Sequence, residues 1–214
     1  MKKIKKIVAL LIVFMPFIAV AQTDQQAKVF FDKTIAVLQN SSLQTDFSVT
    51  YENAVTNDSE TKQGKLLLKG NKFYFLLETI ELFFDGKTQW MYMKEVDEVS
   101  ISEPTGNELS DVNPILMIKE FRKTHTVQFD ADDVASSQNR LLNLYPFDKN
   151  ADHFKVALVV KASTKQIVSI KISFKNGTST LFSTKNYQTL KTLSDATFVF
   201  DKSKYPNVII NDLR

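Results

Sequence analysis

Few residues in this chain have the types and spacing that chemistry requires. Its two histidines, His125 and His153, stand far apart in the sequence and lack the neighbours of a metal-ligand motif. The absence of cysteine excludes disulfides, thiolate metal sites, a cysteine nucleophile and a lipid-modified N-terminal cysteine. No HExxH, GxSxG, GxGxxG or P-loop pattern occurs. We therefore expect both histidines to be surface or strand residues, and we expect no metal and no cofactor.

Paired carboxylates also lack a recognisable pattern. Asp132-Asp133 and the acidic stretch Asp148 to Asp152 do not alternate as the ligands of a calcium loop do, so solvated loops are the simpler interpretation. Carboxylate pairs for acid–base chemistry that are assembled from distant strands remain an open alternative. A lipid hydrolase would need a nucleophile and a base, and the spacing places no serine with either histidine. Nothing positive favours an enzyme, and we expect a non-enzymatic protein.

The N-terminus accounts for the net positive charge of the chain. Four lysines within the first six residues precede an apolar run of about 12 residues, and Ala19-Val20-Ala21 supplies small residues for cleavage. A membrane-spanning helix needs about 20 apolar residues, so we predict a cleavable signal peptide over residues 1–21. Its removal takes four of the 27 basic residues and none of the 24 acidic ones, which changes the net charge from +3 to −1. Nucleic acid is therefore not an expected partner. We expect the protein to be exported to the periplasm.

The remaining residues, 22–214, predict one domain of strands with few helices. Apolar residues at helical spacing predict an amphipathic helix over about 24–40, and alternation from Leu43 to Tyr51 predicts a half-buried strand. Further strands are predicted over 64–69, 72–78, 80–84, 88–93, 96–102, 154–161, 166–175, 178–188, 197–200 and 208–210. Hairpin turns are predicted at Gly70-Asn71, Asp85-Gly86 and Asn176-Gly177, and a short helix is predicted to begin at Pro114.

The apolar residues from Leu66 to Phe84 are the most informative feature of the sequence. Leu66 to Leu68, Phe73 to Leu77 and Leu82 to Phe84 are consecutive, so these strands are apolar on both faces. Something must cover the second face, and the two predicted helices are available for that. A curved sheet closed by helices would enclose an apolar cavity suited to acyl chains. A packed core without a cavity is the alternative, and composition alone favours it.

Several segments resemble the periplasmic outer-membrane lipoprotein carriers of the LolA family. The resemblance follows the order and spacing of motifs over nearly the whole chain after residue 21, and the piece ending in Trp-Met-Tyr92 is the most specific. The matching segments are Gly64-Lys-Leu-Leu-Leu-Lys69, Phe73-Tyr-Phe75, Phe84-Asp-Gly-Lys-Thr-Gln-Trp-Met-Tyr92, Asn113-Pro-Ile-Leu-Met-Ile118, Ala196-Thr-Phe-Val-Phe200 and Pro206-Asn-Val-Ile-Ile-Asn-Asp212.

The resemblance implies a mainly β fold with some α: an incomplete, unclosed antiparallel β-barrel covered by a lid of short helices over a hydrophobic cavity. It also implies a monomeric carrier that binds the acyl chains of lipoproteins. Such a carrier receives them from an ATP-driven, ABC-type release complex in the inner membrane and delivers them to an outer-membrane acceptor. The cavity or lid candidates are Phe73, Phe75, Phe83, Trp90, Tyr92, Ile115, Leu116, Met117, Phe30 and Phe31.

One position departs from the family pattern. The family commonly has an Arg-Pro pair after the lysine that matches Lys69, and that arginine holds the lid closed, whereas this chain has Gly70-Asn71. The latch must therefore differ or be weaker. Phe73 matches an apolar position beside that latch, so we expect it to be incompletely packed. Two other functions stay open: a periplasmic carrier of another amphiphile such as a glycolipid, and a secreted interaction module with a packed core.

Overall fold

The protein is described by a computed structural model that covers residues 17–104, 108 and 114–214. Its two longest helices are α1 (Phe17–Asn40) and α3 (Pro114–Thr124). Two 3₁₀ helices, η1 (Asp195–Phe198) and η2 (Lys202–Lys204), lie near the C-terminus. The strands are β1 (Ser42–Asn53), β2 (Asp58–Lys69), β3 (Lys72–Leu77), β4 (Ile80–Phe84), β5 (Gln89–Met93), β6 (Glu98–Ser102), β7 (His125–Phe129), β8 (Asn139–Pro146), β9 (His153–Lys161), β10 (Ile167–Phe174), β11 (Thr178–Thr189) and β12 (Ile209–Asp212).

The strands form one sheet that does not close on itself. Their order is β12-β6-β5-β4-β3-β2-β1-β11-β10-β9-β8-β7, so β12 and β7 are the two edges. Every neighbouring pair is antiparallel except β12 with β6, which is parallel. The predicted mainly β, unclosed antiparallel architecture with a few helices is therefore confirmed, with one parallel pair at an edge. The three predicted hairpin turns are also confirmed; Gly86, for example, has a φ of +106°, a conformation that favours glycine.

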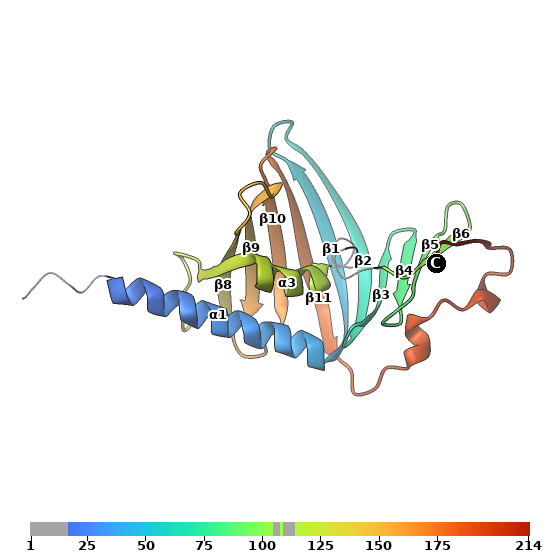
Figure 1. Cartoon of the computed structure of the whole chain (residues 1–214), viewed down its shortest axis with the longest axis horizontal. Helices are drawn as coiled ribbons and strands as arrows, with labels where there is room; N and C mark the ends of the chain where they lie inside the picture. The colour runs from blue at the N-terminus through green and yellow to red at the C-terminus, as the bar shows by residue number, and fades with distance from the viewer. Residues whose placement is uncertain (1–16, 105–107, 109–113) are drawn as a thin grey trace, which may run out of the picture.

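Both helices lie against one face of the sheet, which we call the concave face. Figure 1 shows α1 running along one end of the strands and α3 crossing in front of β8 to β11. The helix predicted over about 24–40 begins earlier, at Phe17, and ends at Asn40 as expected. Residues 1–16 of the predicted signal peptide lie outside the described residues. The helix predicted at Pro114 is confirmed, with proline at its first position.

Strands β3 and β4 bury apolar side chains on both faces, as their sequence predicts, and β5 continues this arrangement. Phe73, Phe75, Leu82 and Phe84 join the core of the concave face, where α1 and α3 also pack. The residues that alternate with them along each strand point to the opposite, convex face, where they form a second cluster. That cluster contains Tyr74, Phe83, Trp90, Tyr92, Val99, Phe200, Tyr205 and Val208.

The C-terminal segment, residues 190–208, covers the convex face, a position that its sequence pattern does not predict. Phe200 lies 5.8 Å from Phe83 and 5.9 Å from Tyr92, measured between ring centroids. The prediction of a strand over 197–200 is wrong, because the first two of these residues belong to η1. The Ser194 side chain accepts a hydrogen bond from the Ala196 amide and so begins a helical turn.

Two strands, β7 and β8, were not predicted. In β8 the consecutive residues Leu142, Asn143 and Leu144 are all buried, which removes the alternation that identifies a half-buried strand. The buried Asn143 is satisfied by donating from Nδ2 to Oδ2 of Asp130 at 2.6 Å. These strands matter for function because β7, β8 and β9 position the two histidines.

Candidate functional site

The concave face brings together most of the predicted cavity residues. Phe30 and Phe31 of α1, Phe73 and Phe75 of β3 and Leu116 of α3 are all buried in its core. Met117 of α3 is partly buried and packs against the same core. The side chain of Ile115 lies outside what the structure describes. Sequence reasoning therefore selected residues of one apolar face from three separate elements.

Three other candidates lie on the convex face and do not meet this group. Phe83, Trp90 and Tyr92 pack beneath the C-terminal segment. The Tyr92 hydroxyl donates to Oδ1 of Asp97 at 3.0 Å, within the hairpin between β5 and β6. Any contact of these three residues with cargo stays a prediction, and it would need a surface other than the concave face.

Phe73 is fully enclosed, contrary to the expectation that it is incompletely packed. None of its surface is exposed, and its ring centroid lies 5.3 Å from that of Phe84 on the neighbouring strand. The cause is the register of β3 against β4, which pairs these two residues on the helix-covered face. Phe73 is a core residue in this conformation.

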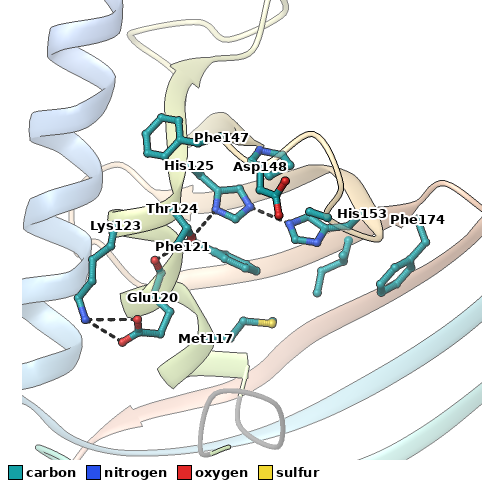
Figure 2. A pocket seen from close by; sticks show the side chains of 13 residues that line it. Met117, Glu120, Phe121, Lys123, Thr124, His125, Phe147, Asp148, His153 and Phe174 are labelled. Atoms are coloured by element: carbon teal, nitrogen blue, oxygen red, sulfur yellow. Dashed lines mark hydrogen bonds and ion pairs between the residues drawn. The ribbon is translucent and has the colours of Figure 1, made fainter. Parts of the chain in front are cut away.

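A pocket of about 530 Å³ opens beside α3 (Figure 2). One wall is the second half of α3, and the other is formed by the loop between β8 and β9 together with the end of β10. The lining residues are Met117, Glu120, Phe121, Lys123, Thr124, His125, Pro146, Phe147, Asp148, Ala151, His153, Ile172 and Phe174. Apolar atoms supply most of the pocket surface, although six of the thirteen lining residues are polar or charged. These six form the polar group of the pocket, and apolar surface with polar groups is typical of ligand sites.

That polar group is built around the two histidines, which the structure brings into contact. Nε2 of His125 lies 2.7 Å from Nε2 of His153, and their rings are stacked with centroids 5.0 Å apart. Phe121 of α3 packs on His125 at a centroid distance of 4.4 Å. His125 begins β7 and His153 begins β9, so the pair exists because β8 hydrogen-bonds to both strands. Both histidines are strand residues, as the sequence predicts, but no spacing in the sequence signals their contact.

Burial keeps both histidines neutral at ordinary pH. Burial, and secondarily His153, lowers the pKa of His125 to about 4. Burial also lowers the pKa of His153; Asp152 acts in the opposite direction, and Lys175 reinforces the lowering. Among the described residues, no group of three or more His, Cys, Asp or Glu side chains could hold a metal ion. The pair is thus a neutral hydrogen-bonding element.

The family model described as outer membrane lipoprotein carrier protein LolA matches residues 17–173. The chain belongs to the LolA family. No protein of curated function matches it. Within the residues that the structure describes, no helix is both long and apolar enough to span a membrane.

Solved structures similar to this LolA-family chain share little sequence with it. An uncharacterized conserved protein from Thermus thermophilus is 10% identical, covers 88% of this chain and 99% of its own, and has a TM-score of 0.56. A LolA superfamily protein from Nitrosomonas europaea is 14% identical over 82% of this chain and 98% of its own, with a TM-score of 0.46. A putative outer membrane lipoprotein-sorting protein domain from Vibrio parahaemolyticus is 13% identical over 82% and 97%, also at 0.46. The Thermus structure shows the same fold.

An ion pair joins the two helices of this LolA-family chain. Arg122 of α3 donates from Nε to Oδ1 of Asp32 on α1, and its Nη2 lies 3.1 Å from Oδ2. The Asp32 carboxylate raises the pKa of Arg122. Both side chains are about 40% exposed, at 38% and 41%, so the pair contributes about 0.2–1 kcal/mol. It is the candidate for the missing family latch, on a different element from the one the family uses.

The residues at the family latch position bind the C-terminal segment instead of α1 or α3. Lys69 and Lys72, which flank Gly70-Asn71, both bind Asp195 of the C-terminal segment, at 2.7 and 2.8 Å. Their hydrogen bonds, first that of Lys69, lower the pKa of Asp195 to about 2. This end of the β2–β3 hairpin therefore fastens the cover of the convex face rather than the helices.

Proposed function

We propose that this protein is a non-enzymatic periplasmic carrier that binds the acyl chains of lipoproteins. In this proposal it collects them from an ABC-type release complex in the inner membrane and delivers them, as a monomer, to an acceptor in the outer membrane. The observation that carries the proposal is the apolar pocket beside α3, which lies on the helix-covered face of an unclosed sheet in a LolA-family chain. The predicted signal peptide over residues 1–21 supports the periplasmic location.

The physical reason for such a carrier is the hydrophobic effect. Each acyl CH₂ group exposed to water costs about 0.8 kcal/mol, so a lipidated protein stays in a membrane or aggregates unless its chains are covered. A carrier needs no reaction to release its cargo, because an acceptor with higher affinity shifts the binding equilibrium. Apolar lining with a few polar groups is what this role requires.

Release of lipoprotein from spheroplasts tests the proposal. The protein without residues 1–21 is added to spheroplasts that retain an acylated lipoprotein, and the lipoprotein in the soluble fraction is measured. We expect release that depends on the added protein and forms a 1:1 complex. Failure to release any lipoprotein would refute the proposal.

A matched pair of variants localises the effect to the pocket. Ala151 lies on the β8–β9 loop and lines the pocket, so Ala151→Trp should fill it with little effect on the core. Ala162 is on the β9–β10 turn and is not among the pocket-lining residues, so Ala162→Trp adds the same bulk elsewhere. We expect Ala151→Trp to lower release strongly and Ala162→Trp to leave it unchanged. Equal release by both variants would place the cargo site outside this pocket.

A further inference from the structure

The size of the pocket limits what it holds in this conformation. A volume of about 530 Å³ falls within the range of about 300–1,000 Å³ that takes one medium-sized ligand. One acyl chain is a ligand of that size, and three chains together are not. Met117, Phe121, Ile172 and Phe174 supply the apolar surface that such a chain would cover.

Hydrogen bonds fix which ring nitrogen of each histidine donates and which one accepts. The Thr124 hydroxyl donates to the Glu120 carbonyl at 3.0 Å, so its oxygen accepts from Nδ1–H of His125 at 2.8 Å. A neutral His125 then has its lone pair at Nε2, which accepts from Nε2–H of His153 at 2.7 Å. His153 is left with an acceptor lone pair at Nδ1, and the described residues provide no donor for it.

The charges around this acceptor disfavour a negatively charged head group. Asp148 lines the pocket, and Figure 2 shows it near the histidine pair. Lys123 lines the pocket too, but its Nζ is paired with Glu120 at 3.0 Å. Outside the pocket lining, Asp152 and Lys175 act on His153 with opposite signs. The polar side of the pocket thus offers acceptors, while its lining cation already has a carboxylate partner.

We propose that this pocket is a site for one acyl chain whose head group carries an N–H or O–H donor and no negative charge, with His153 accepting that hydrogen bond. An N-acyl amide, such as the acylated N-terminus of a lipoprotein, and a monoacylglycerol both have this chemistry. The inference rests on the proposed acyl-chain carrier function and adds the head group that the carrier selects. His153 is then a specificity-determining residue.

A series of ligands with one common chain tests the inference. The dissociation constants of a fatty amide, a monoacylglycerol, a fatty-acid methyl ester and the fatty-acid anion are measured by displacement of a fluorescent acyl probe at pH 7.5. We expect the two donor-bearing ligands to bind roughly fivefold more tightly than the ester, because one hydrogen bond to this acceptor contributes about 1 kcal/mol. We expect the anion to bind more weakly than the donor-bearing ligands. The difference between amide and monoacylglycerol identifies which source of donor the site prefers.

Variants of His153 make the test independent of folding. His153→Gln retains an acceptor and should keep most of the preference for the amide over the ester, whereas His153→Phe should reduce the ratio to about one. The ratio is taken within each variant, so a change in overall stability cancels. Ala151→Trp should weaken all four ligands together, and Ala162→Trp should change none.

The failures of the two proposals are distinguishable. If all four ligands bind equally to the wild-type protein, or if His153→Phe keeps the full preference for the amide, the head-group inference is overturned and the carrier function stands. If none of the ligands displaces the probe and no lipoprotein is released from spheroplasts, the carrier function itself is overturned.

Discussion

Replacing Phe73 with glutamate should unfold the protein rather than impair binding alone. Phe73 has no exposed surface and packs against Phe84. Removing a buried phenylalanine side chain typically costs about 3–5 kcal/mol, and an unpaired buried carboxylate adds to that loss. A domain of ordinary stability has about 5–15 kcal/mol in total, so Phe73→Glu should remove most of it.

Urea unfolding followed by far-ultraviolet circular dichroism measures the effect. Phe147→Glu is the matched control, because Phe147 lines the pocket yet is 61% exposed. We expect Phe147→Glu to change the free energy of unfolding by about 0.5 kcal/mol or less while weakening the binding of an acyl probe. If Phe73→Glu kept the wild-type urea midpoint and lost only probe binding, the assignment of Phe73 to the core would be refuted.

Three further predictions concern packing, the latch and pH. Gly64→Ala would place a methyl group 2.2 Å from Cζ of Phe47, so we expect a loss of about 3 kcal/mol or more in urea unfolding; wild-type stability would contradict this. Arg122→Met removes the ion pair with Asp32 and should cost about 1 kcal/mol or less while speeding hydrogen exchange in α3; unchanged exchange would exclude a latch. The folded-state pKa of His125 is about 4, below its ordinary 6.5, so the folded state binds fewer protons between these values and the melting temperature should fall as pH drops from about 6.5 to 4. His125→Gln should flatten that dependence, and an equally steep profile in the variant would assign it to other groups.

The sequence predicted well the elements whose pattern is local. Alternation from Leu43 to Tyr51 lies within β1, and the consecutive apolar residues of β3 and β4 are buried on both faces. Pro114 marks the first residue of α3. In each case the signal depends on neighbouring residues along one strand or helix, which a single sequence contains.

The parts that were missed depend on contacts between distant segments. The histidine pair requires β7 and β9 to flank β8, and β8 hides its strand character because Asn143 is buried with a partner, Asp130, on another segment. The cover of the convex face depends on Lys69 and Lys72 binding Asp195, far along the chain. Neither arrangement follows from residue spacing, because the strand order brings the groups together.

The closure of the lid depends on apolar contacts more than on its ion pair. Leu116, Ile118 and Phe121 of α3 are each at most 9% exposed, and burying three such side chains stabilises closure by about 5–9 kcal/mol, against about 1 kcal/mol or less for Arg122 with Asp32. Loss of the latch alone would therefore leave α3 mostly in place. An acyl chain that buries about ten CH₂ groups gains about 8 kcal/mol, which is similar to the cost of exposing this helix face. Cargo that covers the surface vacated by α3 could thus displace the helix at little net cost, and short chains would instead have to fit beside a closed lid.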